Sequence, residues 1–343
     1  MKIMKRMKSI YMKYAVTMLI AALVIGTFMV LATSNSAAEE VKYTFYYVDH
    51  GTPGNPFWTV YFKGIEDAAE WLAARGVKVK HLSASADLKK QIDMLKVAVA
   101  ADPDGIITTM IDPKSFDSIL KPAIESGIPL MAANVEDPRP REERIPYLCY
   151  YGEDTWKSGV EVAQALVEHI KKTGGFEPKH ALLCNPMAGH YVWEARLEMF
   201  GKTLEEIYGT TSEKIVIGED PTKAVEIIKA YLVKHPETDV ICATNWATHF
   251  NVDLLKELGK EAGKDVYLTA FDTMPELLED IKEGKVVCTH DQQQYLQGFL
   301  PLIDMYLYKV GTLHPFGIIS TGPIIVDTNN VDEVMVGVKA GYR

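Results

Sequence analysis

The side chains of this protein that could do chemistry are amides, carboxylates and aromatic rings placed just after short apolar runs. The clearest example is the stretch HGTPGNPFW, which follows the run YTFYYVD and leads into an amphipathic segment. Here Asn55 could hydrogen-bond a hydroxyl, and Phe57 and Trp58 could stack on an apolar ligand face. Taken alone, an aromatic pair at such a junction is more often packing between elements.

Comparable groups recur after later apolar runs along the chain. They are Asn134, His190 with Tyr191, Asn245 with Trp246, Asp272 with Thr273, and Asp291 with Gln292. In an open α/β sheet, ligands bind at the carboxyl ends of the strands, so we expect these side chains to share one site. Together they suit hydroxyl groups held between flat apolar faces.

Each of these residues also has a structural interpretation. Asp272 and Asn245 could cap the helices that follow them. Tyr191 and Trp246 could belong to the core or to its rim, and Gln292 begins a QQQ run of the kind that is usually solvated. Each residue taken alone is therefore compatible with a ligand-binding role and with a structural role, and only the wider pattern can distinguish the two.

Signatures of catalysis are missing from the sequence. It contains no GxSxG elbow, no GxxxxGK[ST] phosphate loop and no GxGxxG after a strand. His190, His249 and His290 do not show the HxxxH or HExxH spacing of metal ligands. We therefore expect a binding protein with no cofactor and no metal site, and not an enzyme.

The elements that must position these residues alternate along the chain. Apolar or β-branched runs predict strands at TFYYVDH, VKVKHLS, GIITTMI, PLMAANV, PYLCYYG, HALLCNP, KIVIGED, DVICATN, VYLTAFD and VVCTHDQ. Amphipathic segments predict helices at 57–75, 87–101, 115–126, 155–173, 192–208, 223–235 and 247–258. This alternation is typical of parallel sheets covered by helices on both faces. That many strands predict an α/β fold with two similar, doubly wound parallel-sheet domains.

The first 38 residues have the composition of an export signal. Five basic residues precede an apolar run from Tyr14 to Ala32, and SNSAA follows with small residues suited to cleavage. The apolar run is long enough that an uncleaved membrane anchor remains an alternative. Without this segment, which holds five of the 36 basic residues and none of the 46 acidic ones, the net charge is −15. Such an acidic protein is a poor partner for nucleic acid or for an anionic membrane surface.

The four cysteines are widely spaced, and each lies in an apolar run. They are Cys149, Cys184, Cys242 and Cys288. Export would permit disulfides, but the spacing favours single buried thiols on strands, and connectivity cannot be read from the sequence.

The order of several short motifs resembles a known family. NPFW, IPLMAAN, TNW, AFD and HDQ, together with the export signal and the doubled α/β pattern, are similar to periplasmic sugar-binding proteins of ABC importers. The resemblance is to the ribose-binding type with the type I solute-binding fold, and it spans essentially the whole chain after residue 38. It implies two domains joined by three chain crossings, with a ligand cleft between them. The limits it implies are 41–149 plus 291–320 for the first domain and 150–290 plus 321–343 for the second.

The resemblance also implies roles for individual residues. Asn55, Phe57 and Trp58 would grip the sugar. Asn134 falls where the family has a carboxylate, Asn245 where it has an asparagine, and Asp272 and Gln292 match its aspartate and glutamine. Tyr191, Glu194 and Trp246 complete the expected ligand-binding set. Two family arginines are replaced, one by Val135 and one by Glu194, with Arg196 two residues further on.

The implied function is an exported, monomeric receptor that delivers its ligand to an ABC transporter permease. The alternative is the same fold serving a membrane chemotaxis or sensor protein. With two family arginines replaced, carboxylates outnumber cationic donors in the expected cleft, which favours a neutral sugar or polyol, or an amino sugar. We expect sugar phosphates and sugar acids to be rejected and ribose to bind poorly.

Overall fold

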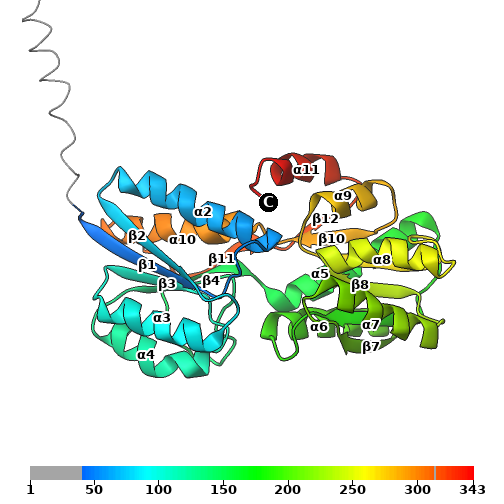
Figure 1. Ribbon diagram of the computed structural model, residues 1–343, viewed down its shortest axis with the longest axis horizontal. Coiled ribbons are helices and arrows are strands. Elements are labelled where there is room, and N and C mark those ends of the chain that lie inside the picture. The colour runs from blue at the N-terminus through cyan, green and yellow to red at the C-terminus, as the bar shows by residue number, and fades with distance from the viewer. Residues whose placement is uncertain (1–40, 313) are drawn as a thin grey trace, which may run out of the picture.

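The computed structural model describes residues 41–312 and 314–343, and within them the chain forms two lobes (Figure 1). The predicted export signal lies outside the described residues. Each lobe is built on a six-stranded sheet, with the strand order β11-β5-β4-β3-β1-β2 in the first lobe and β12-β10-β9-β8-β6-β7 in the second. The predicted fold class, two doubly wound α/β domains, is confirmed.

The first lobe takes its elements from both ends of the described chain. They are β1 (Tyr43–Asp49), α2 (Pro56–Ala73), β2 (Val77–Ser83), α3 (Leu88–Ala100), β3 (Gly105–Thr108), α4 (Pro113–Glu125), β4 (Leu130–Ala133), β5 (Cys149–Glu153), α10 (Gln294–Lys309) and β11 (Gly317–Gly322). All strand pairings of this sheet are parallel.

The second lobe is mainly continuous in sequence. It contains α5 (Thr155–Thr173), β6 (His180–Asn185), α6 (Tyr191–Tyr208), β7 (Thr211–Val216), α7 (Pro221–Lys234), β8 (Val240–Thr244), α8 (Asn245–Glu257), β9 (Tyr267–Phe271), α9 (Pro275–Lys282), β10 (Cys288–Asp291), β12 (Ile324–Val326) and α11 (Val331–Lys339). Only β12 pairs antiparallel, to β10, among the described strands of this sheet.

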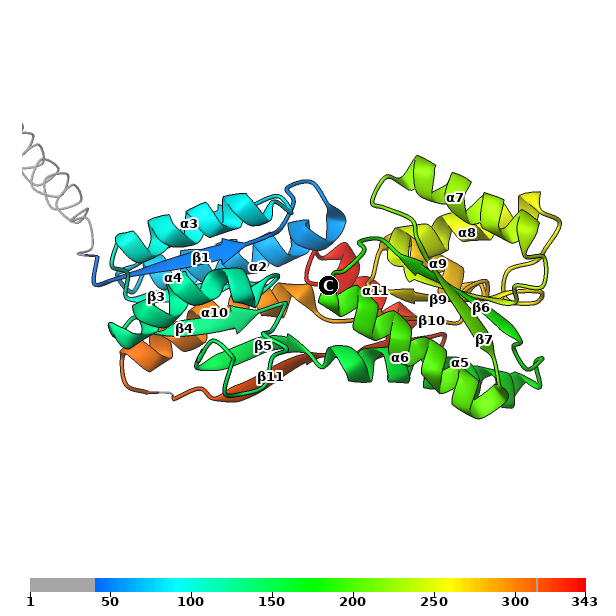
Figure 2. The same ribbon diagram turned by 90° about the horizontal axis from the view of Figure 1, so that it is seen from below.

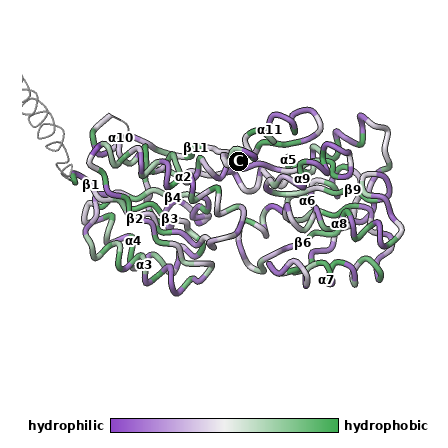
Figure 3. The backbone as a smooth tube through the Cα atoms, turned by 45° about the horizontal axis from the view of Figure 1, so that its top comes forward, coloured by the Kyte–Doolittle hydropathy of each residue, from purple (hydrophilic) through white to green (hydrophobic). Residues whose placement is uncertain are grey.

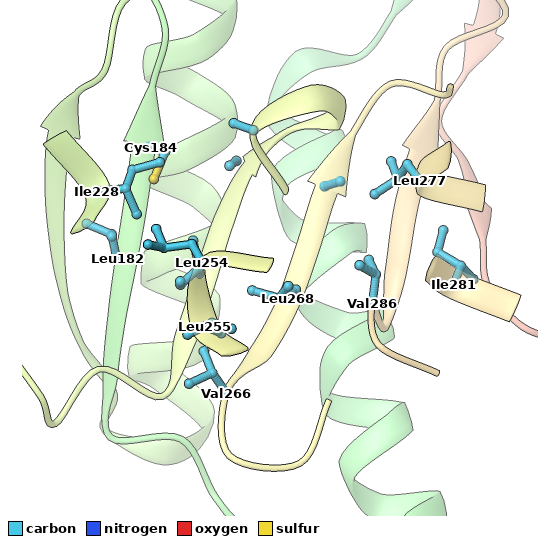
Figure 4. Packing of buried hydrophobic residues seen from close by; sticks show 14 of the residues in the cluster. Leu182, Cys184, Ile228, Leu254, Leu255, Val266, Leu268, Leu277, Ile281 and Val286 are labelled. Carbon is cyan, nitrogen blue, oxygen red and sulfur yellow. The ribbon is translucent and has the colours of Figure 1, made fainter. Parts of the chain in front are cut away.

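Helices cover both faces of each sheet, which explains why the strands read as continuous apolar runs. Every residue of β3, β4, β5, β8, β9 and β10 is buried. In the second lobe, one face of the sheet buries side chains such as Leu182 and Leu268 in a cluster that includes Ile228 of helix α7 (Figure 4). Hydrophobic segments run through the strands inside both lobes (Figure 3). Each lobe therefore has a core of its own.

Helix starts follow from the local sequence. Asp87, Asp112, Asp154 and Asp220 are N-caps whose carboxylates accept a hydrogen bond from a backbone N–H of the first turn. The parallel strands of both sheets point their carboxyl ends toward the middle of the molecule, as β1, β4 and β10 show (Figure 2). The loops and helix starts that follow the strands consequently face one another between the lobes.

The chain crosses between the lobes three times, after β5, after β10 and between β11 and β12. The sequence placed the first crossing at 149/150, but β5 pairs with β4 and β11 of the first sheet and carries the chain on to Glu153. In the first lobe, α10 packs closely on α2 because Gly64 has no side chain, and a Cβ there would clash with the Tyr295 carbonyl oxygen. This contact fixes the start of α10, and with it the second crossing, against the first lobe.

The four cysteines are buried free thiols on β5, β6, β8 and β10, as the sequence predicted. Between residues 41 and 343, leaving residue 313 aside, no helix combines the length and apolar character needed to cross a membrane.

Candidate ligand-binding cleft

A cavity of about 160 Å³ lies between the lobes at the carboxyl ends of the strands. The first lobe contributes His50, Thr52, Asn55, Pro56, Phe57, Trp58, Ala86, Asn134 and Val135. The second lobe and the crossings contribute Pro186, Met187, His190, Val192, Trp193, Arg196, Glu219, Thr244, Asn245, Trp246, Asp272 and Gln292. Eight of the ten predicted site residues thus line one cavity, namely Asn55, Phe57, Trp58, Asn134, Asn245, Trp246, Asp272 and Gln292.

The wall of the first lobe is an aromatic cluster at the start of α2. The Trp58 ring is only 9% exposed and contacts His50 edge-on at 4.7 Å and Phe57 at 5.1 Å between ring centroids. A Cβ at Gly51 would lie 2.6 Å from the Trp58 ring, so this glycine lets the indole pack against the loop after β1. Trp58 therefore belongs to the first lobe's core and also lines the cavity, while its stacking on a ligand stays a prediction.

Asn55 begins α2 as its N-cap. Its side-chain oxygen accepts a hydrogen bond from the Phe57 N–H at 3.0 Å, and Pro56 occupies the first helical position, where no N–H is needed. The amide NH₂ of Asn55 is left as a donor beside the cavity. The cap and the aromatic pair are consequently one local unit.

A chain of side-chain amides joins the two walls of the cavity. Asn134 Nδ2 donates to Gln297 Oε1 at 2.9 Å, Gln297 Nε2 donates to Gln292 Oε1 at 3.1 Å, and Gln292 Nε2 donates to Asp272 Oδ1 at 2.6 Å. Asn134 belongs to the first lobe, the two glutamines follow the second crossing, and Asp272 belongs to the second lobe. This relay fixes the polar groups of both walls relative to one another.

Asp272 is not a helix cap. The N-cap of α9 is Met274, and Asp272 instead adopts the left-handed conformation, with φ +70°. That conformation is uncommon for a residue with a side chain and is worth attention at a functional site. Its side chain is 8% exposed and engages Gln292 through one oxygen, which leaves the other oxygen as an acceptor.

Asn245 is also not the cap of the helix that follows it. Thr244 caps α8, while Asn245 Nδ2 donates to the Thr273 carbonyl at 3.0 Å and its Oδ1 accepts from the Trp246 N–H at 2.8 Å. The Asn245 side chain thus ties the start of α8 to the loop that carries Asp272. Its contribution to the cleft is to position that loop as well as to line the cavity.

A buried ion-pair cluster lies beneath the second lobe's wall. Arg196 on α6 donates through Nε to Glu153 Oε1 at 2.7 Å and through Nη2 to the same oxygen, while His290 Nε2 lies 2.5 Å from Glu153 Oε2. Glu153 is 1% exposed. Burial alone would raise the pKa of Glu153, but Arg196 and His290 outweigh it and hold that pKa at about 2. The cluster therefore joins the end of β5, at the first crossing, to α6 and β10.

Two histidines face each other across the cavity, His50 from the first lobe and His190 from the second, with ring centroids 6.0 Å apart. His50 Nδ1 lies 2.8 Å from Thr109 Oγ1, and the buried His190 Nδ1 has no hydrogen-bond partner in the described chain. Burial, assisted by the neighbouring His190, lowers the pKa of His50 well below its usual value. Burial and then Arg196 lower the pKa of His190 to about 4. Both rings are accordingly neutral at pH 7.

The structure does not bring Tyr191 and Glu194 to the cavity lining. The Tyr191 hydroxyl accepts a hydrogen bond from Trp156 Nε1 at 2.9 Å. Glu194 accepts from Asn185 Nδ2 at 2.8 Å and from the Gly189 N–H at 2.9 Å, and it pairs with Lys214 of β7. The helical turn explains this placement, because Val192 and Arg196 occupy the inward face of α6 and Glu194 lies between them on the β7 side.

Several residues of this site were missed by the sequence reasoning. Glu153 could have been found, because it follows an apolar strand in the same way as the residues that were predicted. Gln297 gave no such signal, since it lies one turn inside α10 in a stretch that reads as an ordinary helix. His50 gave no signal beyond its place in the loop after β1, whereas His190, which was expected to lie with the other groups that follow strands, does line the cavity. Glu219 also lines the cavity, whereas the next residue, Asp220, caps α7.

Comparisons with known proteins agree with this architecture. Residues 48–311 match the family model described as periplasmic binding protein domain. The xylose/arabinose-binding protein XylF of Sulfolobus acidocaldarius is 25% identical over 301 residues, which cover 84% of this chain and 72% of XylF. The ribose import binding protein RbsB of Bacillus subtilis is 22% identical over 255 residues, covering 73% of this chain and 76% of RbsB.

Solved structures of similar fold include proteins of carbohydrate transport. A carbohydrate transporter protein from Acidothermus cellulolyticus, in complex with myo-inositol, has a TM-score of 0.73 and 25% identity, covering 88% of this chain and 99% of that one. A periplasmic sugar-binding protein of an ABC sugar transporter from Legionella pneumophila has a TM-score of 0.69 and 28% identity, covering 82% of this chain and 100% of that one.

Proposed function

Because this chain belongs to the periplasmic binding protein domain family, we propose that it is an exported receptor that captures a neutral sugar or polyol between its lobes and delivers it to an ABC transporter permease. The resemblance drawn from the sequence, to sugar-binding proteins of ABC importers, is confirmed. The named ligands of the relatives are xylose, arabinose, ribose and myo-inositol, all small and rich in hydroxyl groups.

The observation that carries the proposal is one cavity lined by both lobes, with aromatic rings in its lining and a relay of amides that runs from Asn134 of the first lobe to the Asp272 carboxylate of the second. Phe57 and Trp58 offer apolar faces to the C–H groups of a sugar ring. Asp272 and the amide of Asn55 offer an acceptor and a donor to its hydroxyls. These roles of the lining residues are part of the proposal.

The charges of the cavity favour a neutral ligand. Arg196 is the one Lys or Arg in the described lining, and its charge is compensated by Glu153. Asp272 and Glu219 add two acidic groups, so a phosphate or carboxylate on the ligand would meet net repulsion. We therefore propose a neutral sugar or polyol, or an amino sugar. The Arg196 nitrogen Nη1, which Glu153 does not engage, is the cationic donor available to one ligand oxygen.

Binding, and not catalysis, accounts for the arrangement. A ligand that touches both walls binds the closed form better than the open form, and that difference in affinity drives the lobes together. The three chain crossings form the hinge for this motion. The closed, loaded form is then the species that a permease distinguishes from the empty one.

The test is a thermal-shift screen over pentoses, hexoses, polyols, amino sugars, sugar acids and sugar phosphates, followed by calorimetry on each compound that responds. A ligand specific for the folded protein raises its melting temperature. We expect a neutral or amino sugar to bind and ribose to bind weakly. If no sugar binds, or if a sugar acid binds best, the proposed ligand class is wrong. Chromatography of the bound sugar after incubation would reveal turnover and contradict a purely binding role.

We place the protein outside the cytoplasm as a monomer, on the grounds of its family and of the export pattern in its first 38 residues. Light scattering tests the monomer. Sugar-dependent stimulation of ATP hydrolysis by an ABC permease encoded beside this protein would support delivery. An adjacent chemotaxis or sensor gene, with no such stimulation, would favour the signalling alternative.

A further inference from the structure

A cluster of possible metal ligands lies on the second lobe, away from the cleft. His180 is the first residue of β6, Glu213 lies near the start of β7, and His235 follows the end of α7. One ligand atom from each of these residues lies within 4.8 Å of those of the other two. The cleft residues of this lobe instead follow the carboxyl ends of the strands, such as Pro186 after β6 and Asn245 after β8. The cluster is therefore at the opposite end of the sheet.

Both imidazoles of the cluster have their Nδ1 engaged by an outer partner. His235 Nδ1 lies 3.1 Å from Glu237 Oε1, and a carboxylate accepts hydrogen bonds, so this Nδ1 carries the proton. His180 Nδ1 lies 2.9 Å from Thr211 Oγ1, whose own proton goes to the Lys179 carbonyl at 3.1 Å. In each neutral ring, the lone pair therefore resides on Nε2. Histidines that bind metals are oriented in this way, by a partner on the other ring nitrogen.

The phenol of Tyr231 lies between two groups that each offer a lone pair. Its oxygen is 2.8 Å from His180 Nε2 and 3.0 Å from Glu213 Oε2, and a single phenol proton can serve only one of them. A metal ion bound by His180 and Glu213 accepts both lone pairs at once. The Tyr231 ring stacks on His235 at 4.4 Å, which holds the third ligand nearby. Coordination requires a turn of the partly exposed His235 ring, whose outer torsion is soft.

We propose that His180, Glu213 and His235 form a site for a divalent transition-metal ion of the Zn²⁺, Ni²⁺ or Cu²⁺ class. Two imidazoles and one carboxylate suit these ions, whereas Mg²⁺ and Ca²⁺ prefer sets made entirely of oxygen ligands. The ion links β6, β7 and the end of α7, so its role is to stabilise the second lobe. The sequence shows no metal motif here because the three ligands come from separate elements.

The experiment uses untagged protein that has been treated with a chelator. Zn²⁺, Ni²⁺ and Cu²⁺ should each raise the melting temperature by several degrees with one ion bound per chain by calorimetry, and Mg²⁺ and Ca²⁺ should not. The Cu²⁺ complex should show nitrogen couplings from two imidazoles by electron paramagnetic resonance. His180→Asn and His235→Asn should each abolish the shift. Glu237→Gln, which alters only the outer partner of His235, should weaken binding by about 10-fold.

The matched control is His314→Asn, because His314 is an exposed histidine of the first lobe and should leave the metal response unchanged. A hydrogen bond from Tyr231 to His180, with the exposed Glu213 carboxylate in contact with water, would satisfy the cluster without any metal, and that arrangement predicts no response to metal in the wild-type protein. That result would overturn the proposal, as would equal metal affinity in the wild type and in both cluster histidine variants. Circular dichroism of every variant verifies that it is folded.

Discussion

The two walls of the cleft are built from different chemistry. The first lobe's wall is aromatic and amidic, and its described lining contains no carboxylate, lysine or arginine. The second lobe's wall carries Arg196, Glu219 and Asp272. The first wall is also part of its lobe's core, since Trp58 packs among Tyr61, Ile65 and other buried residues. The first wall thus combines aromatic faces with neutral polar groups, and the second wall, which also has Trp193 and Trp246, supplies the charged side chains.

This difference suggests that the first wall contributes mainly to affinity and the second wall mainly to selectivity among sugars. Aromatic faces accept the C–H side of many sugars, so the first wall contributes affinity with little discrimination. Charged acceptors and donors fix which hydroxyls are satisfied, and an unsatisfied polar group in a closed cleft is costly. Variants in the second wall should therefore change which sugar is bound, and variants in the first wall should weaken all sugars together.

The largest expected effect is on the ion-pair cluster behind the second wall. Arg196→Met should lower the free energy of unfolding by about 3–5 kcal/mol, because it leaves the buried Glu153 carboxylate without its main partner. Chemical denaturation measures this loss. The control is Lys214→Met, which removes a partly exposed ion pair with Glu194 and should cost about 0–1 kcal/mol. Equal losses in the two variants would mean that the cluster does not anchor the second wall.

The second effect is on binding. Asp272→Ala should weaken sugar binding by about 1–3 kcal/mol or more, since a ligand hydroxyl and Gln292 Nε2 both lose their acceptor. Asp272→Asn should shift the preference among sugars more than the overall affinity. Asp253→Asn, an exposed change on α8, serves as the control. Normal affinity of Asp272→Ala by calorimetry would remove Asp272 from the binding site.

The third effect is on the pH dependence of stability, through His50 of the first wall and His190 of the second. The pKa of His190 is about 4 in the folded protein, and that of His50 is also lowered, against about 6.5 for an unfolded histidine. Below pH 6.5 the unfolded chain binds protons that the folded chain does not. The contribution of these neutral histidines to the free energy of unfolding is therefore fully present above this pH and falls as the pH drops toward 4. For His190 alone, the loss at pH 5 is about 2 kcal/mol. The His190→Gln variant should lose stability less steeply between pH 7 and pH 5, and an unchanged slope would show that the ring is not buried as a neutral group.

The sequence predicted the fold well because its signals are local. Apolar runs and helix caps such as Asp87 and Asp154 need only neighbouring residues to be recognised, and both caps are present. Eight of the predicted cleft residues were recognised by the order of the motifs in a known family and by their place after strands. The structure brings those eight to one cavity, although their binding roles stay predictions.

The rest of the site depends on partners distant in sequence. Glu153 and Arg196 are 43 residues apart, and Asn134 and Gln297 are 163 apart, so no local pattern indicates that they meet. The placement of Glu194 failed for a different reason. The sequence located the correct helix start, but a two-residue difference along α6 separates the face toward the cleft from the face toward Lys214.

The smallest effect concerns the first wall. Trp58→Ala would test packing and sugar contact together, because Trp58 is a core residue whose removal would also destabilise the protein. Trp58→Phe keeps an aromatic face and separates the two roles. We expect it to weaken binding by about 0.5–1.5 kcal/mol, the scale of one aromatic contact, and to do so by a similar factor for every sugar that binds. Calorimetry with two different sugars tests both parts. A loss confined to one of them would show that the first wall also selects, and the division of labour between the walls would then be wrong.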